Sequence, residues 1–509
     1  MRSARIQEVL ILGGGSAGWL AAALLAAERG QGEDALRVTL VESPNTPPIG
    51  VGEGTWPTMR DTLRRIGLSE RDLLRHADAA FKQGSRFVGW RNGQDVYHHP
   101  FSLPQGHGEL PLVAAWAAAT PRSDFAAAVG PQPAVCLAAR APKQSSTPDY
   151  AAVLNYGYHF DAGRFVPLLQ RHAVQHLGVR HHVAHVQRVE RHTDGDLAAL
   201  HTEAGERLAA DLFIDCSGLQ ARLIGQELGV PWVSQRGVLF NDRALAVQVP
   251  HADPQGPLAS QTLATAHSQG WIWEIGLPTR RGVGCVFARD FATEAQAHDA
   301  LQTYLAPQGS GSAEPRLIRF DPGHRARFWE RNCLAVGLAG GFIEPLEASA
   351  LALIELSVQQ LCDDFPTDRA AMDTVARRMN DTLDYRWGRL VEFLKLHYVL
   401  SERSDSAYWR AHRDPSSCPE RLREQLQLWA HRPPSRRDLP MAEELFPSAS
   451  YQYVLYGMGF ATPGMGGPAR PDEQRAAQAL LADQPARTQR LLAALPDHRR
   501  LLQELTQGH

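Results

Sequence analysis

Two carboxylates suited to acid–base chemistry, Glu344 and Glu347, lie in the run GLAGGFIEPLEASALALIE, in which most neighbours are small or apolar. An ionised carboxylate is costly to bury in such surroundings unless it is paired, so it often marks a site with shifted proton affinity. At spacing i, i+3 the two would share one helix face, but Pro345 opposes a continuous helix until it has been passed. The alternative is a helix-entry loop in which Glu344 or Glu347 caps backbone N–H groups.

A glycine-rich turn near the N-terminus predicts a dinucleotide site. A buried strand is expected at 6–12, and an alanine- and leucine-rich helix that ends near Gly30 follows the turn. In this strand–turn–helix context the backbone can approach a pyrophosphate at the helix N-terminus. A second strand at 37–41 ends at Glu42, at the spacing of a carboxylate that binds ribose hydroxyls. The turn residues expected to contact the cofactor are Gly13, Gly15, Ser16, Ala17 and Gly18.

The type of dinucleotide is indicated by two further segments. A second glycine-rich loop contributes Gly50, Val51, Gly52 and Glu53, a pattern more typical of FAD enzymes than of simple dehydrogenases. A strand expected at 210–217 is similar to the second adenine-side contact of glutathione-reductase-type flavoproteins. The chain has only one complete GxGxxG motif, so the sequence shows no sign of a second, nicotinamide-binding domain. FAD is therefore favoured over NAD.

Basic and aromatic side chains supply the remaining candidates. A helix predicted over 63–81 delivers Lys82, a position where lysine is most often a solvated helix-end charge. The aromatic and imidazole cluster at 97–101 would either stack on a flat substrate or plug a sheet edge. Period-two spacing places Trp271, Trp273 and Ile275 on one sheet face, as core residues or as the wall of a cavity.

Composition limits the class of protein. The 509 residues suggest two or three units, and 44% hydrophobic with 21% charged residues is typical of a soluble globular protein. A formal net charge of −3 gives no electrostatic reason to expect nucleic acid or an anionic membrane as partner. The six cysteines are widely separated, so we expect reduced, mostly buried thiols in a cytoplasmic protein, with no metal site. No apolar run reaches membrane-spanning length.

The elements that must position these residues indicate an α/β (α+β) fold. Strand-like segments are expected at 183–215 and 234–290, and 105–149 is expected to run over the surface. Asp161 and Thr367 are plausible N-caps of helices, and the region after 471 is helical and amphipathic. We predict an FAD-binding domain at 1–385, with inserted substrate-site segments at about 85–150, and a mainly helical substrate-covering domain at 386–509.

Four segments together resemble the flavin-dependent tryptophan halogenase family. They occur in the expected order and spacing over nearly the whole chain: GGGSAGW at the start, Phe81-Lys82 followed by FVGW, then WIWEIG, then GFIEPLE. The resemblance implies a PHBH-like FAD-binding domain, and FADH2- and O2-dependent halogenation of an electron-rich, indole-type aromatic with chloride or bromide. It also implies that hypohalous acid passes along a tunnel and that a separate NAD(P)H flavin reductase supplies the reduced flavin. A homodimer is compatible with the resemblance.

The resemblance assigns roles to the candidate residues. Lys82 matches the tunnel lysine, which hydrogen-bonds the oxidant or forms a haloamine. Glu347 matches the essential glutamate, which orients the halogenating species and accepts the proton lost from the ring. Further matches are the pair His99 and Phe101 that sandwiches the indole, Trp271 and Trp273 that keep the substrate from the flavin, Leu338 beside the flavin, and Ser349 and Ala350 whose backbone holds the halide.

The chain departs from the family pattern at two positions. Gly276 stands where the WxWxIP motif has proline, and Ala348 where many members have serine. The nearest alternative is a flavin hydroxylase of the same fold, but these enzymes usually have Gly-Asp after the late strand, whereas Gly337 is followed here by Leu338. Halogenation is therefore favoured over hydroxylation. A third alternative is an FAD-binding protein that does not halogenate.

Overall fold

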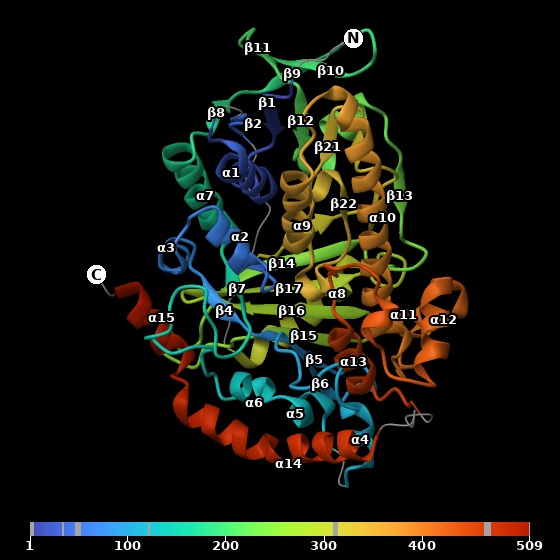
Figure 1. The fold of residues 1–509 in the computed structure, drawn as a ribbon. Helices are drawn as coiled ribbons and strands as arrows, with labels where there is room; N and C mark the ends of the chain where they lie inside the picture. Colours follow the sequence, from blue (N-terminus) through green and yellow to red (C-terminus); the bar gives the residue numbers. More distant parts are fainter. Residues whose placement is uncertain are drawn as a thin grey trace. The chain divides into compact units, whose positions relative to one another are not determined.

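The computed structural model describes residues 5–32, 35–45, 52–120, 123–308, 314–462 and 470–507 (Figure 1). The chain divides into two compact units, each made of three sequence stretches. Unit 1 contains Met1–Asp78, Phe160–Gln235 and Asp321–Gly388, and unit 2 contains Ala79–His159, Arg236–Phe320 and Arg389–His509. The predicted α/β class is confirmed. The assignment of 386–509 to a substrate-covering domain stays a prediction.

Unit 1 is organised around a six-stranded sheet in the order β20-β21-β12-β1-β2-β8. All neighbours are parallel except β20 and β21. Residues 9–12 are buried because helices cover a parallel sheet of this kind. The strands are β1 (Glu8–Leu12), β2 (Arg37–Glu42), β8 (Arg180–Val183), β12 (Leu212–Asp215), β20 (Trp329–Glu330) and β21 (Cys333–Ala335).

The helices of unit 1 pack around α1, whose residues 18–26 are all buried. Helices α7 and α9 contact α1 (Figure 1). Asp161 caps α7 as predicted, because its side chain accepts a hydrogen bond from Gly163 N at 2.8 Å. The helices are α1 (Ser16–Arg29), α2 (Met59–Arg65), α3 (Glu70–His76), α7 (Ala162–His176) and α9 (Ala350–Asp363).

Smaller sheets complete unit 1. Strands β9 (Val186–Arg191), β10 (Leu197–Thr202) and β11 (Arg207–Ala209) form an antiparallel sheet in the predicted 183–215 region. A second three-stranded sheet contains β13 (Trp232–Ser234), β19 (Gly323–Arg325) and β22 (Gly341–Phe342). The two-residue strand β3 (Glu53–Gly54) also belongs to this unit.

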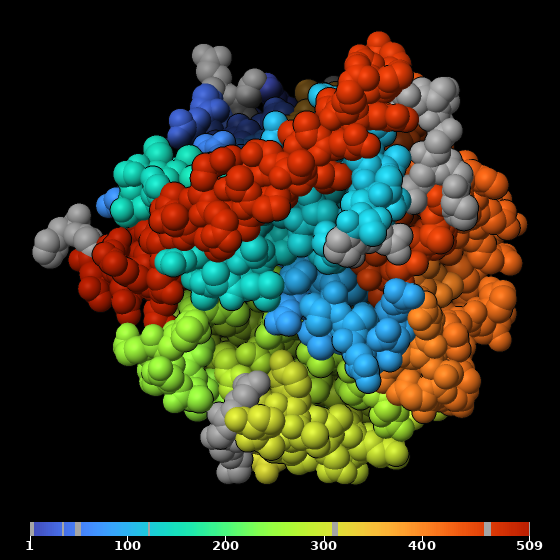
Figure 2. Space-filling view, turned by 90° about the horizontal axis from the view of Figure 1, so that it is seen from below, coloured from blue at the N-terminus to red at the C-terminus, as the bar shows by residue number. Residues whose placement is uncertain are grey.

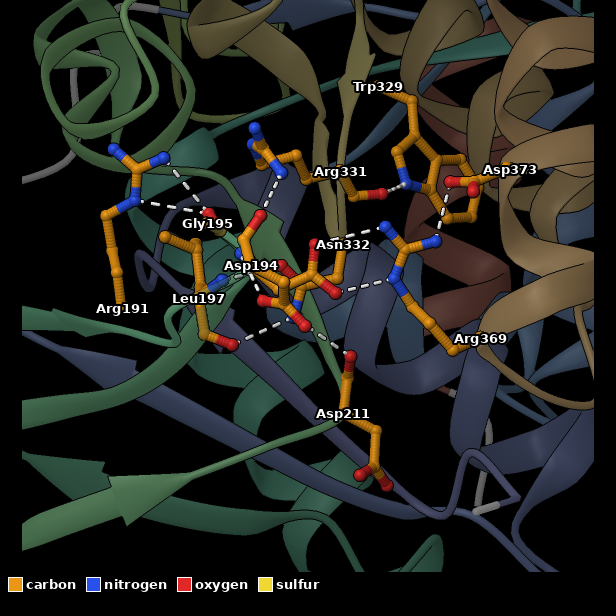
Figure 3. Close-up of polar contacts among 11 residues, drawn as sticks. Arg191, Asp194, Gly195, Leu197, Asp211, Trp329, Arg331, Asn332, Arg369 and Asp373 are labelled. Carbon is orange, nitrogen blue, oxygen red and sulfur yellow. Dashed lines mark hydrogen bonds and ion pairs between the residues drawn. The ribbon is translucent and has the colours of Figure 1, made fainter. Parts of the chain in front are cut away.

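Asn332 connects three segments of unit 1 just before β21 (Figure 3). Its side-chain amide donates to the carbonyls of Leu197 and Asp211, at 2.9 and 3.1 Å, and its Oδ1 accepts from Leu197 N at 2.8 Å. Nearby, the Arg369 guanidinium donates to both carboxylate oxygens of Asp196, at 2.5 and 3.0 Å. These contacts fix where β21 enters the sheet, and β21 leads directly into the segment that contains Leu338.

Unit 2 contains a seven-stranded sheet in the order β18-β14-β17-β16-β15-β5-β6. Only β15 and β5 are parallel neighbours. The strands are β5 (Gly84–Val88), β6 (Val96–Pro100), β14 (Arg243–Pro250), β15 (Thr262–His267), β16 (Gly270–Gly276), β17 (Arg280–Phe287) and β18 (Arg316–Arg319). Helix α8 (Glu294–Leu305) packs its apolar side against β14 and β17. A separate antiparallel pair joins β4 (Ala80–Lys82) to β7 (Gly157–Phe160).

The remaining helices of unit 2 include a long helix, α14, that lies across the short helices α4, α5 and α6 (Figure 2). Helix α10 (Arg369–Val399) contributes residues to both units. No helix among the described residues is both long enough and apolar enough to cross a lipid bilayer. The helices not yet given are α4 (Leu112–Ala118), α5 (Phe125–Val129), α6 (Gln132–Leu137), α11 (Ala407–His412), α12 (Glu420–Trp429), α13 (Ser448–Gly457), α14 (Pro471–Ala494) and α15 (His498–Gln507).

Three local predictions were wrong. The helix expected over 63–81 is two short helices, because Gly67 adopts a left-handed φ of 73° and Ser69 caps a new helix by accepting from Asp72 N. Residues 105–149 do not merely run over the surface, since they form α4, α5 and α6 and bury aromatic side chains. Asp368 rather than Thr367 caps α10, because its Oδ1 accepts from Ala371 N at 2.9 Å.

Candidate functional site

The glycine turn of unit 1 has the shape that a dinucleotide requires. Gly13 has φ +119°, and a Cβ there would lie 2.1 Å from the carbonyl oxygen of Cys216. A Cβ on Gly14 would lie 1.5 Å from Glu42 Oε2, whereas Gly15 has no heavy atom within 4 Å of its Cβ position. The turn is therefore closed on the protein side and open before Ser16, where α1 begins and its first N–H groups point outward.

Glu42 is held in place at the carboxyl end of β2. Its Oε1 lies 2.7 Å from His181 Nε2, on the neighbouring strand β8. The His181 ring in turn contacts the Trp19 indole edge-on, with centroids 5.1 Å apart. A carboxylate fixed beside the glycine turn is the arrangement that binds ribose hydroxyls, so the residues of unit 1 fit an FAD molecule. The predicted contacts Gly50 and Val51 lie outside the described residues.

The segment that contains Glu347 is not a simple helix entrance. It forms a short 3₁₀ turn at Leu346–Ala348, in which Glu347 has φ 65° and Ala348 has φ 53°. Left-handed conformations cost non-glycine residues roughly 1–2 kcal/mol each, so the surrounding structure imposes this turn. Helix α9 begins only at Ala350, after Pro345 has been passed, as predicted. The N–H groups of Ser349 and Ala350 therefore lie at a helix N-terminus, which favours anions.

Two contacts tie this turn to the rest of unit 1. The Trp56 indole Nε1 donates to the backbone oxygen of Glu347 at 2.8 Å, and only 5% of Glu347 is exposed. A Cβ on Gly337 would lie 2.7 Å from the Ala17 Cβ, so the 3₁₀ turn Gly337–Ala339 lies against the start of α1. Leu338 is thereby placed beside the glycine turn. The predicted flavin segment and the Glu347 turn meet in one unit.

Glu355, the last residue of the run that contains Glu344 and Glu347, is a buried carboxyl group that the sequence analysis did not select. It accepts hydrogen bonds from Thr62 Oγ1 at 2.5 Å and Thr58 Oγ1 at 3.3 Å, and so joins α9 to α2. Burial raises its pKa to about 8, although the two threonine hydrogen bonds oppose this shift. Burial also raises the pKa of Glu53 to about 7. Both carboxyl groups hold protons at neutral pH more readily than an exposed glutamate.

Lys82 occupies a buried strand position in unit 2, not a solvated helix end. Its side chain is fully buried, and Nζ lies 5.1 Å from the centre of the Phe101 ring. This is the distance of a cation–π contact. The position of Phe101 is fixed by a backbone hydrogen bond, in which its N–H donates to the carbonyl of Gln83 at 3.1 Å. Lys82 and Phe101, which the sequence placed in the same site, are thus neighbours.

Two histidines that sequence reasoning missed support the Lys82 strand. Ala80 pairs with His159 across β4 and β7, so His159 and Lys82 share one face of this strand pair. His159 Nε2 lies 2.8 Å from Thr262 Oγ1, and burial, together with the charge of Lys82, holds its pKa well below the usual range. The other histidine, His498, accepts a hydrogen bond from Phe81 N at 3.1 Å.

His498 connects α15 to the strand before Lys82. Because its Nε2 accepts from Phe81 N, the neutral ring carries its proton on Nδ1 and donates to the carbonyl of Leu258 at 3.1 Å. Burial lowers the pKa of His498 to about 4. Arg499 adds hydrogen bonds to the carbonyls of Gly256 and Pro278, at 2.7 and 2.9 Å. The last helix therefore braces the lysine strand.

The predicted aromatic contacts of the substrate are buried in unit 2. His99 Nε2 lies 2.8 Å from Ser450 Oγ, and the His99 ring lies 6.0 Å from the Tyr453 ring. Helix α13, which carries both partners, packs against β6. The neighbouring residue His98 differs from His99 in its direction, because successive residues of a strand face opposite sides of the sheet. Burial lowers the pKa of His98 to about 4.

Trp271 and Trp273 share one face of β16, as the period-two pattern predicts. Their ring centroids are 6.3 Å apart, and they are 1% and 7% exposed. Each lies opposite small or branched residues of the neighbouring strands, and Trp273 pairs with Gly284. A Cβ on Gly284 would lie only 2.0 Å from the Trp273 ring, so the indole lies flat over this glycine. No local sequence pattern indicates this pairing.

The structure groups the predicted residues by unit. Lys82, His99, Phe101, Trp271 and Trp273 belong to unit 2. The glycine turn, Glu42, Leu338, Glu347, Ser349 and Ala350 belong to unit 1. All six cysteines lie among the described residues and are buried, as predicted; their reduced state stays a prediction.

Comparisons with known proteins identify relatives of this geometry. A family model described as tryptophan halogenase matches residues 8–466. Tryptophan 7-halogenase RebH of Lentzea aerocolonigenes is 32% identical over 81% of this chain and 80% of its own length. A crystal structure of a tryptophan halogenase from Shewanella frigidimarina superposes with a TM-score of 0.96 at 46% identity, covering 99% of this chain and 98% of that one. BrvH, a flavin-dependent halogenase from Brevundimonas, superposes with a TM-score of 0.86 at 32% identity, covering 98% and 99%.

Proposed function

Since this chain belongs to the tryptophan halogenase family, we propose that Lys82 and Glu347 are the catalytic residues of its reaction. The protein is an FADH2-dependent halogenase that uses halide and acts on an indole-type aromatic. The observation that carries the proposal is Lys82, a fully buried ammonium group 5.1 Å from the Phe101 ring. Burial of a charged group costs free energy of folding, so a buried lysine indicates a functional or structural role.

The residues of unit 1 hold the cofactor and the halide in this proposal. The glycine turn and Glu42 bind FAD, and the N–H groups of Ser349 and Ala350 bind chloride or bromide at the start of α9. FADH2 bound there would supply two of the four electrons that reduce O2, the halide would supply the other two, and the products would be hypohalous acid and water. We further propose that a separate flavin reductase supplies FADH2, because the sequence has one complete GxGxxG motif.

The two catalytic side chains have different tasks. Lys82 hydrogen-bonds hypohalous acid through an N–H group or carries its halogen as a haloamine. As the ring carbon bonds to the halogen, the halogen–oxygen bond breaks and the oxygen leaves as water with a proton from Lys82, or the halogen–nitrogen bond of the haloamine breaks and frees the lysine amine. The proton that the ring carbon loses passes to the Glu347 carboxylate. His99 and Phe101 hold the aromatic ring of the substrate. Trp271 and Trp273, which are buried and therefore rigid, keep the substrate away from the flavin.

The test supplies reduced FAD, O2 and either halide to the wild type and to Lys82→Met, with indole and tryptophan as substrates. We expect halogenated product from the wild type and at least about a hundredfold less from Lys82→Met, the loss typical of removing a hydrogen-bond donor that stabilises a reacting group. FAD affinity, measured by fluorescence quenching, stays unchanged. The matched control is Lys143→Met, because Lys143 is also buried and lies 5.7 Å from the Tyr156 ring centre but is not one of the predicted site residues.

Two results would contradict the proposal. Full turnover by Lys82→Met would exclude its catalytic role. A hydroxylated product made by the wild type without halide would show that the enzyme is a hydroxylase. The role of Glu347 is tested in the same assay by Glu347→Gln, which keeps the side-chain size but accepts no ring proton. The reductase proposal fails if NADH or NADPH alone supports turnover.

A further inference from the structure

A cavity of about 530 Å³ lies in unit 2, and no step of the proposed reaction uses it. Pro100 and Ser102 line this cavity. Pro100 points to the opposite face of β6 from His99, because successive residues of a strand alternate between faces. Tyr453 lies between the two sides, since it lines the cavity and its ring is 6.0 Å from that of His99. Neither His99 nor Phe101 lines the cavity, although Tyr453 is shared between the cavity and the surroundings of His99.

Most of the cavity wall is apolar. Two of the lining side chains are unusually exposed for their type, with Leu103 at 58% and Val153 at 47%. A bound molecule with an apolar body would cover them and gain the free energy of that burial. The volume is within the range of small-molecule sites. The apolar lining side chains that matter most here are Pro100, Leu103, Val129, Pro131, Val153 and Leu491.

The polar end of the cavity is positive. Arg487 and Arg490 both line it, and their i, i+3 spacing places them on one face of α14. Arg487 makes no hydrogen bond or ion pair with any residue that the structure describes. Arg490 is 66% exposed and lies 3.4 Å from Asp483, a weak surface pair. None of the described lining residues is acidic. Two guanidinium groups in this position favour a carboxylate, which they can bind through paired hydrogen bonds.

Gln132 connects the cavity to the lysine strand. It lines the cavity, is 1% exposed, and accepts a hydrogen bond from Ser102 N at 2.8 Å. Its side-chain amide donates to the carbonyl of Asn155 at 2.7 Å and to Gln83 Oε1 at 3.3 Å. Gln83 follows Lys82 directly and accepts from Phe101 N. A ligand that orders Ser102 and Gln132 therefore acts on the same hydrogen-bond network that holds Phe101.

We propose that this cavity is a second ligand site, which binds an organic acid with an apolar body. The carboxylate pairs with Arg487 and Arg490, and the apolar body covers Leu103 and Val153. Occupancy reduces the motion of the segment around Ser102 through Gln132. The site does not require the proposed catalytic residues to be correct, since none of them lines the cavity.

The probe is hexanoate, which has no aromatic ring to halogenate, and its neutral counterpart hexan-1-ol. Binding to the full chain is measured by calorimetry without flavin or halide, so the result does not depend on the proposed function. We expect hexanoate to bind the wild type at least tenfold more tightly than hexan-1-ol, and Arg487→Gln/Arg490→Gln to lose this preference. Arg475→Gln, an exposed arginine on the same helix outside the cavity, keeps it.

A second variant and a second measurement separate a filled cavity from a damaged fold. Gly130 lines the cavity, and a Cβ there meets only one atom within 4 Å, at 3.7 Å. Gly130→Phe is therefore expected to fold and to abolish binding of both probes. Hydrogen exchange of the wild type should slow in peptides around 100–105 and 129–132 when hexanoate binds. Equal affinity for the two probes, retention of the preference by the double variant, or protection only elsewhere would overturn the proposal.

Discussion

Glu355 makes the stability of unit 1 depend on pH in an unusual direction. Burial raises the pKa of this carboxyl group from 4.5 to about 8, so the folded protein binds its proton more tightly than the unfolded chain does. The stabilisation from that proton is complete below pH 4.5 and is lost as the pH rises towards 8. A salt-bridged carboxylate would show the opposite trend.

The magnitude follows from the two pKa values. Linkage gives a loss of about 3 kcal/mol in the free energy of unfolding between pH 5 and pH 8, from Glu355 alone. Glu355→Gln cannot ionise, and its carbonyl can still accept from Thr62 Oγ1. We expect the variant to match the wild type near pH 5 and to exceed it by about 3 kcal/mol at pH 8.

The assay is urea unfolding at 25 °C from pH 5 to pH 8, at constant ionic strength, followed by tryptophan fluorescence. Glu206→Gln serves as the control, because Glu206 is an exposed carboxylate of the same unit. Infrared spectroscopy should show a protonated carboxyl band at pH 7 that is weaker in Glu355→Gln than in the wild type, because Glu53 still contributes to it. Parallel loss of stability by the wild type and Glu355→Gln over this pH range would refute the reasoning, because it would mean that Glu355 is already ionised.

Three further changes test other contacts. His498→Ala leaves the buried Phe81 N–H without its acceptor, so we expect a loss of about 2–4 kcal/mol in urea unfolding; a loss below about 1 kcal/mol would show that this brace is dispensable. Gly284→Ala should displace the Trp273 indole, cost about 1–3 kcal/mol and shift the tryptophan emission, and unchanged emission would contradict the flat packing. Glu42→Gln should weaken FAD binding about tenfold in a fluorescence titration, since a charged acceptor is lost, and an unchanged affinity would exclude the ribose contact.

Some of the unit 1 site could be predicted because its signals are local. The turn between β1 and α1 depends on glycines next to the elements that they join, and Glu42 follows its strand directly. Pro345 likewise delays α9 through a rule of backbone geometry. In each case the chemistry that fixes the structure lies within a few residues of the structure itself.

The environment of Lys82 could not be predicted in the same way. Lys82 is buried on a strand because β4 pairs with β7, about seventy-five residues further along the chain, and no local pattern distinguishes that strand from a helix end. Gly284 accommodates Trp273 only through the register of β16 and β17. The left-handed conformation of Glu347 is imposed by surroundings such as Trp56, not by its own side chain.

The hydrogen bond from Phe81 to His498 also has a consequence for how the protein is made. It joins residues 417 positions apart, so the strand before Lys82 obtains this contact only after almost all of the described chain has been synthesised. Until His498 has been synthesised, Phe81 N lacks this acceptor, whereas the pairing of β4 with β7 needs only residues up to 160. The strand that carries Lys82 is therefore held in part by the chain's own C-terminal helix, α15, through a contact of very large sequence separation.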